Sequence, residues 1–276
     1  MIFQLQSVEE LAGRVFDGAK IAVPGDRFGV PMELSRALVR SGVKDLHLVT
    51  VPASGLMVDF LIGAGCVGTI ETSGCSLSEF GVARRFMDAV KSGSVRLIDA
   101  TCPAIYAGLA AAERGLPFMP IRGIIGSDLI EARDDWKVVQ NPLADEGEED
   151  PILVVKAIKP DFAVFHAPMA DSLGNVWIGR ERDLISMAHA AKEALVTVEE
   201  VIGGDMFADE RLTAGAMSAL YVGGIAQAER GSWPMDLPAR YGVDPEHLAE
   251  YAKLAESPEG FSQYLERHVF GRGEAA

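Results

Sequence analysis

Short apolar runs alternate with longer amphipathic segments along most of the chain. The apolar runs predict strands at 20–23, 46–51, 67–72, 94–99 and 194–201. Apolar residues spaced by three and four predict a helix at 79–91, and further helices are expected at 31–41, 59–65, 102–114 and 184–193, the first three of which end at a glycine. Two further runs, PILVVKAI (151–158) and DFAVFHAP (161–168), are typical of strands buried on both faces. Alternation of this kind predicts an α/β fold, with a mostly parallel sheet and flanking helices.

The end of the chain has a different pattern. Residues 244–270 are predicted to form two polar helices with one apolar side, made by Leu248, Tyr251, Leu254, Phe261, Tyr264 and Leu265. The only stretch typical of a solvated loop is ADEGEEDP (144–151), which we interpret as an insertion or hairpin tip rather than a linker. With no internal repeat, the sequence predicts a single domain over 1–276.

Composition and charge narrow the possible partners. The 276 residues carry 40 acidic against 25 basic side chains, a formal charge of −15, so nucleic acid is not expected as a partner. No apolar run reaches the roughly 18–20 residues that span a bilayer, and the first ten residues lack the basic and apolar regions of a signal peptide. The three cysteines show no CxxC spacing and predict reduced thiols in a cytoplasmic protein.

The turn PGDRFGVP (24–31) lies between a predicted strand and a predicted helix. In α/β folds, ligands bind outside the carboxyl ends of parallel strands, and glycines let backbone N–H groups approach an anion. Gly25, Asp26, Arg27, Phe28 and Gly29 are therefore candidates for a ligand-binding loop. A tight connection without function is the alternative, because the phosphate-binding patterns GxGxxG and GxxxxGK[ST] are both absent.

A second glycine-containing stretch, GLPFMPIRGIIGSDL, covers 115–129. Gly123, Gly126 and Ser127 form an amide-rich loop beside Arg122, which could bind a substrate carboxylate through its two-pronged donor geometry. A structural ion pair with one of the many acids is an equal alternative.

Three other places hold residue types that can carry chemistry. His166 ends an apolar strand and is more often a structural group than a base, and 171–175 is a turn by residue type. Glu79 could be a nucleophile, although an acid in a first helical turn needs no function. Cys102 before Pro103 could be a reactive thiol, but burial as a small apolar side chain is the stronger expectation. No His/Cys/Asp group has the sequence spacing of metal ligands, so no metal is predicted.

These stretches together resemble the A (alpha) subunit of family I coenzyme A transferases, closest to the glutaconate CoA-transferase type. The resemblance covers nearly the whole chain and is carried by FDGAKIAVPGDRFGVPMELSRALVRSGVKDLHLVT (16–50), FGVARRFMDAVKSGSVRLID (80–99), GLPFMPIRGIIGSDL (115–129), the block from Asn141 to Arg180 that includes FHAPMADSLGN, and the closing YGVDPEHLAEYAKLAESPEGFSQYLERHVF (241–270). The family's GGF turn reads PGDRFG here, and its late APxGAHP block reads VGGIAQAERGSWP (222–234). Both departures fall where ligand contacts are expected.

The resemblance implies an enzyme whose catalytic glutamate belongs to a B subunit. CoA would be a substrate, with no permanently bound cofactor, and the assembly an α2β2 complex acting on an acyl-CoA and a carboxylic acid. In that setting the turn at 25–29 would supply N–H donors to an oxyanion opposite the partner's glutamate, and Arg122 would orient the acid end of the substrate.

Relatives of the same family with other activities imply alternatives. They include a decarboxylase of a branched glutaconyl-CoA and a hydrolase that opens a ring of a steroid-derived CoA thioester. The hydrolase uses an acid of its A chain near the start of the helix before LPF, where this chain has Cys102, with Asp99 three residues earlier. From a different class, a non-catalytic ligand-binding module of the same fold remains open, since sugar-phosphate isomerases and effector-sensing regulators share it.

Overall fold

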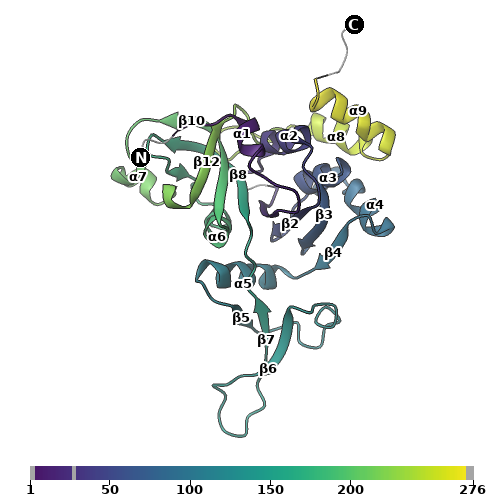
Figure 1. Ribbon diagram of the computed structural model, residues 1–276, viewed down its shortest axis with the longest axis vertical. Helices are drawn as coiled ribbons and strands as arrows, with labels where there is room; N and C mark the ends of the chain where they lie inside the picture. The colour runs from purple at the N-terminus through teal and green to yellow at the C-terminus, as the bar shows by residue number, and fades with distance from the viewer. Residues whose placement is uncertain (1–3, 27–28, 272–276) are drawn as a thin grey trace.

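The structure, a computed structural model, describes residues 4–26 and 29–271 and is built around a nine-stranded sheet (Figure 1). Strands β1 to β4, β8, β10 and β12 pair in parallel, while the short β9 and β11 pair antiparallel at one edge. The strands are β1 (Lys20–Pro24), β2 (Leu46–Val51), β3 (Val67–Thr72), β4 (Arg96–Asp99), β8 (Phe162–Asp171), β9 (Val176–Trp177), β10 (Glu193–Ile202), β11 (Ala216–Met217) and β12 (Val222–Gln227). The mostly parallel sheet predicted from the sequence is confirmed.

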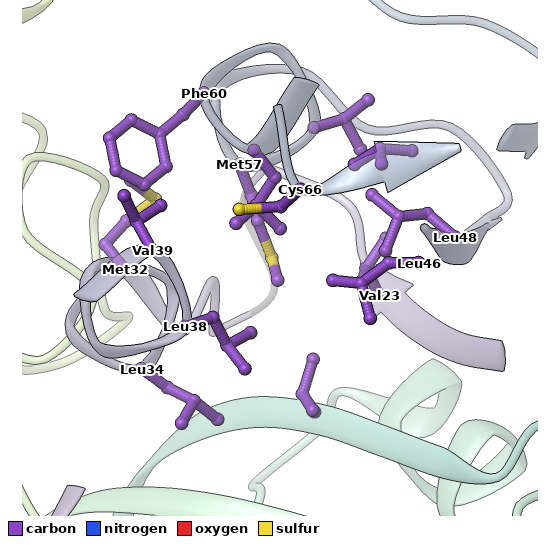
Figure 2. Packing of buried hydrophobic residues seen from close by; sticks show 14 of the residues in the cluster. Val23, Met32, Leu34, Leu38, Val39, Leu46, Leu48, Met57, Phe60 and Cys66 are labelled. Atoms are coloured by element: carbon purple, nitrogen blue, oxygen red, sulfur yellow. The ribbon is translucent and has the colours of Figure 1, made fainter. Parts of the chain in front are cut away.

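Helices cover both faces of this sheet. On β1 and β2, Val23 and Leu48 face a core shared with α1, α2 and α3, whereas Ala22 and Val49 face a second core shared with α5 and α6. Figure 2 shows the first core, where side chains of α2 and α3 converge on Val23, Leu46 and Leu48. The helices are α1 (Val8–Ala12), α2 (Met32–Ser41), α3 (Leu56–Gly63), α4 (Arg84–Ser92), α5 (Cys102–Glu113), α6 (Arg182–Ala190) and α7 (Glu210–Thr213).

The two helices expected at the end of the chain are α8 (Pro245–Leu254) and α9 (Pro258–His268). Their aromatic side chains Tyr251 and Tyr264 are fully buried in the first core. The Tyr251 hydroxyl donates to Oδ2 of Asp59 (2.7 Å), whose Oδ1 accepts from the backbone N–H of Phe86 (2.8 Å). Burial raises the pKa of Asp59 in spite of these bonds. One buried carboxyl group therefore ties the tail, α3 and α4 together.

A second sheet of three antiparallel strands lies below α5 in Figure 1. It contains β5 (Phe118–Ile121), β6 (Trp136–Gln140) and β7 (Pro151–Lys156) in the order β5-β7-β6. The prediction of a doubly buried strand at 151–158 is wrong, because only Leu153 and Val155 of β7 are buried. The stretch 115–129, for which no strand was predicted, contains β5. The expected hairpin tip at 144–151 does connect β6 to β7.

The helix predicted at 79–91 begins later than expected. Ser78–Phe80 forms a single 3-10 turn, and α4 starts at Arg84. Ser78 (φ 54°) and Gly81 (φ 111°) both have backbone conformations that interrupt a helix, and Gly81 has no side chain to oppose this. At 31–41 the difference is smaller, since Pro31 precedes the first helical residue.

Among the described residues, no helix combines the length and the apolar character needed to cross a membrane.

Candidate active site at the carboxyl edge of the main sheet

The bend after β1 packs against β8 through Gly29. The Gly29 carbonyl accepts a hydrogen bond from the backbone N–H of His166 (2.7 Å). A Cβ at Gly29 would lie 2.1 Å from the His166 carbonyl oxygen, and φ there is +71°. Only glycine fits both conditions, so close packing explains this position. Arg27 and Phe28 of the same predicted loop lie outside the described residues.

The bend faces a cavity of about 610 Å³. Gly29 and His166 form part of its wall, and the remaining lining comes mainly from Trp177, the start of α6 and residues 237–239. Gly29 lines this cavity, whereas Gly25, directly after β1, is buried and is not among the lining residues. The structure thus places Gly29, but not Gly25, at a cavity, and the catalytic role of both glycines stays a prediction.

His166 is fully buried, and both of its ring nitrogens have partners. Nδ1 lies 2.8 Å from the Thr197 hydroxyl, and Nε2 lies 2.7 Å from Oε1 of Glu199. Burial lowers the pKa of His166, which outweighs the opposing effect of Glu199. With both nitrogens engaged inside the protein, His166 has no free nitrogen to serve as a base, and its side chain supports the cavity wall.

Glu199, on β10, was not identified from the sequence. Besides His166, its carboxylate accepts hydrogen bonds from the Tyr241 hydroxyl (2.7 Å) and from the backbone N–H groups of Arg230 (2.9 Å) and Gly231 (3.2 Å). Burial would raise the pKa of Glu199, but these hydrogen bonds lower it to about 2. The carboxylate is therefore ionised and holds the loop after β12 against the sheet. The only sequence signal was a glutamate pair at the end of an otherwise apolar strand.

The predicted turn at 171–175 is confirmed and is structural. The buried Asp171 carboxylate accepts from the N–H groups of Leu173, Asn175 and Met206 and from the Asn175 side-chain amide, all at 2.8–2.9 Å. With four donors already bonded to it, the Asp171 carboxylate has no remaining lone pair to accept a hydrogen bond from a ligand.

Asp26 and Glu79 lie at the same small cavity, of about 30 Å³. This volume holds about one water molecule and no acyl substrate. Oδ2 of Asp26 lies where a Cβ on Gly55 would be, 2.1 Å away, so this carboxylate is packed tightly against the start of α3. Glu79 is exposed in the 3-10 turn. Neither residue lines the 610 Å³ cavity.

Cys102 is exposed, so the expectation of burial is wrong. Thr101 caps α5 through its hydroxyl, which accepts from the Ala104 N–H, and Cys102 is the first residue of that helix. Its Sγ lies 3.3 Å from the Ser73 hydroxyl, which follows β3. The thiol is therefore at the same carboxyl edge of the sheet as the bend. Asp99, at the end of β4, is exposed and lines a separate open cavity of about 600 Å³ beside the small sheet.

The second glycine loop lies in the small sheet. Arg122 forms a two-pronged ion pair with Asp150, with Nη2 to Oδ2 at 2.6 Å, and this pair lowers the pKa of Asp150 to about 2. Gly126 and Ser127 belong to a surface turn closed by the Ser127 N–H on the Ile124 carbonyl. None of these residues lines the cavity at Gly29. The structural ion pair is what the described residues show, and a substrate role for Arg122 stays a prediction.

Comparison with known proteins decides the family. The coenzyme A transferase family model matches residues 5–218. The chain belongs to the coenzyme A transferase family. The resemblance drawn from the motifs, the fold and the CoA-transferase class are thereby confirmed.

Relatives match over nearly the whole chain. The A chain of the 3-oxoadipate CoA-transferase of Pseudomonas knackmussii is 30% identical, over 97% of this chain and 94% of that protein. A cholesterol ring-cleaving hydrolase IpdA subunit of Rhodococcus jostii is 27% identical, over 96% and 91%. An uncharacterised protein of Archaeoglobus fulgidus is 29% identical over 97% of this chain, which spans 59% of the length of that relative.

Two solved structures match the fold closely. Glutaconate coenzyme A-transferase of Acidaminococcus fermentans superposes with a TM-score of 0.87 at 25% identity, over 98% of this chain and 90% of that one. A variant of the decarboxylase AibA/AibB gives 0.85 at 28% identity, over 98% and 100%.

Proposed function

We propose that this chain is the alpha subunit of a CoA-transferase that moves CoA between carboxylic acids, and that it works with a B subunit in an α2β2 assembly. The observation that carries the proposal is the bend at Gly29, which is fixed on His166 at the wall of a cavity of about 610 Å³. Similarity over nearly the full length to the A chain of 3-oxoadipate CoA-transferase supports it.

The nucleophile is assigned to the partner because the described part of this chain offers no nucleophile paired with a base. Among the described candidates, Glu79, Asp99 and Cys102 are exposed, and none lines the cavity at Gly29. His166, which lines that cavity, has both nitrogens engaged. A glutamate brought by the B subunit supplies what is missing.

The proposed chemistry runs through covalent intermediates on that glutamate. Its carboxylate attacks the thioester carbonyl of the acyl-CoA, giving an acyl-glutamyl anhydride and free CoA thiolate. The thiolate attacks the glutamyl carbonyl of the anhydride, which releases the first carboxylate and leaves a glutamyl-CoA thioester. The second carboxylate repeats the two steps in reverse, so that the new acyl-CoA leaves and the glutamate is restored.

The role proposed for this chain is to bind the oxyanion that forms in each step. A carbonyl under attack gains negative charge on oxygen, and preset N–H donors stabilise it without reorganisation. The N–H groups of Gly25 and Gly29 are the donors assigned to this role. The Glu199–His166 pair positions them, because it fixes the β8 segment on which Gly29 packs.

The test is to measure CoA exchange between a thioester and a free carboxylic acid with the chain alone and with its co-expressed B subunit. We expect exchange only from the complex, together with a CoA adduct on the B subunit that mass spectrometry detects. Full activity of the isolated chain would contradict the need for a second polypeptide. Loss of CO2 without exchange would instead favour the decarboxylase alternative, and net thioester hydrolysis without exchange would favour the hydrolase alternative. If only sugar phosphates raised the unfolding temperature of the complex, a non-catalytic binding module would be favoured.

A further inference from the structure

We propose that His247, Glu250 and His268 form a binding site for a divalent metal ion of the zinc type. His247 and Glu250 stand three residues apart on α8, and His268 is the last residue of α9. One ligand atom from each residue lies within 4.8 Å of the other two. The sequence alone carries no metal signal, because the third ligand comes from a different helix.

The distances between the ligand atoms are close to those around a tetrahedral ion, and small side-chain movements would bring them into range. Oε2 of Glu250 lies 4.0 Å from Nδ1 of His247, and its Oε1 lies 3.5 Å from Nε2 of His268. Ligand atoms about 2.0–2.2 Å from a tetrahedral zinc ion are roughly 3.3 Å apart. The two imidazole rings meet edge to face, with centroids 4.7 Å apart and planes at 79°. Two imidazoles and one carboxylate are a ligand set that zinc uses.

One of the donor atoms has no hydrogen-bond partner. Nε2 of His268 is buried, and Oε1 of Glu250, 3.5 Å away, is too far for a good hydrogen bond among the described residues. A buried polar atom left unpaired destabilises the folded protein, and coordination to a metal ion would remove that deficit.

Outer contacts orient two of the three residues. Nε2 of His247 lies 2.8 Å from the Tyr264 hydroxyl, which directs Nδ1 toward the proposed ion. Arg267 pairs with Oε1 of Glu250, the oxygen 3.5 Å from His268, so an ion there would share this carboxylate with Arg267. Metal-binding side chains are commonly oriented by such second contacts.

The charge state also suits coordination. Imidazole binds a metal ion in its neutral form, and burial lowers the pKa of His247 and that of His268, which favours this form. Arg36 also acts on His247 as a nearby cation, and it is paired with Glu33 (3.2 Å). An ion can enter through an open cavity of about 530 Å³, of which His268 forms part of the wall.

Such an ion would hold the end of α9 on α8. It would stabilise the tail, and the proposal is independent of the CoA-transferase reaction. The test uses the full chain, freed of metal and titrated with Zn²⁺, with metal content measured after dialysis and the unfolding midpoint Tm measured with and without the ion. We expect one Zn²⁺ bound per chain and a rise in Tm, because an ion that binds only the folded state stabilises it.

Variants separate this site from adventitious binding at cysteines. Loss of an outer contact commonly lowers metal affinity about 10–100-fold. His268→Gln removes a ligand and should lower Zn²⁺ affinity by at least that factor, whereas Tyr264→Phe removes an outer contact and should lower it about tenfold. The matched control is His189→Gln, since Nδ1 of His189 lies 3.6 Å from Oε1 of Glu113 without a third ligand among the described residues. It should bind Zn²⁺ as the parent does.

Equal Zn²⁺ affinity in the parent and His268→Gln would overturn the proposal, as would the absence of any Zn²⁺-dependent rise in the parent's Tm. Should His268→Gln fail to fold, Glu250→Gln gives the same test from a more exposed position. Co²⁺ supplies a second readout, because a tetrahedral imidazole–carboxylate site gives it visible absorption that the same variants should abolish.

Discussion

Two glycine-containing loops of this chain look alike in sequence and end in opposite surroundings. Both Gly29 and Gly126 have left-handed backbone conformations, with φ of +71° and +87°. At Gly29 an added Cβ would meet the backbone of β8 at 2.1 Å, whereas at Gly126 no atom lies within 4 Å. The first loop is built into the main sheet and the second lies on the surface of the small one. Turn residues therefore reveal backbone conformation, but the packing partner decides whether a loop is part of a rigid site.

Two arginines repeat the contrast. The Arg133 side chain is 4% exposed and donates to the Glu71 carboxylate at 2.7 Å, which joins the segment before β6 to β3 of the main sheet. The Arg122 side chain is 66% exposed and pairs with Asp150 within the small sheet. Burial would raise the pKa of Glu71, but His47, Lys20 and Arg133 lower it to about 2, so the pair is ionised. Of these two pairs, the buried one connects the two sheets.

The largest effect is expected from Glu71→Ala. This change leaves the Arg133 guanidinium buried without its carboxylate, and breaking a buried pair from one side costs about 3–5 kcal/mol. The free energy of unfolding should fall by that amount in urea titrations. A loss below about 1 kcal/mol would show that Asp135, which also pairs with Arg133 at 2.9 Å, suffices on its own.

An intermediate effect is expected from Gly29→Ala, with Gly126→Ala as its matched control. Both substitutions place a side chain at positive φ, which costs about 1–2 kcal/mol, but only the first also drives a methyl group into a carbonyl oxygen. CoA exchange by the complex should fall on the order of 10²–10³-fold for Gly29→Ala, because the displaced N–H no longer meets the oxyanion. Equal activity of the two variants would separate the bend from catalysis.

The smallest effect is expected from Arg122→Ala. Exposed ion pairs contribute about 0–1 kcal/mol, so unfolding should hardly change. The informative measurement is the KM for the carboxylic acid in the assembled complex. A large rise in KM would restore the substrate role predicted from the sequence, and an unchanged KM would leave Arg122 as a structural partner of Asp150.

The sequence predicted the main sheet well because its strands are apolar on both faces and its turns carry glycine. The strands at 46–51 and 67–72 were located to the residue. The small sheet was mostly missed. Few of its strand residues are buried, since β5 has none, β6 only Trp136, and β7 only Leu153 and Val155. Pro117 and Pro120 also interrupt the pattern at β5, so periodicity gave little signal there.

The candidate site was predicted only in part, since its contacts join distant segments. The bend was identified from its glycines and its place after a strand. The hydrogen bonds that Glu199 makes with His166 and with Tyr241 could not be seen, because the three residues lie on separate stretches of chain. Cys102 was expected to be buried by residue type, but its place at the start of α5 exposes it.

The buried contact between Tyr251 and Asp59 bears on where this protein can be cut. The family match ends at residue 218, yet α8 and α9 lie beyond it and fill the core over α3. A fragment trimmed to the matched region would expose that apolar surface to water. It would also leave the Asp59 carboxyl group without the hydrogen bond from the Tyr251 hydroxyl. Expression of such a fragment should give aggregated material, so any study of the catalytic edge has to keep the last helices.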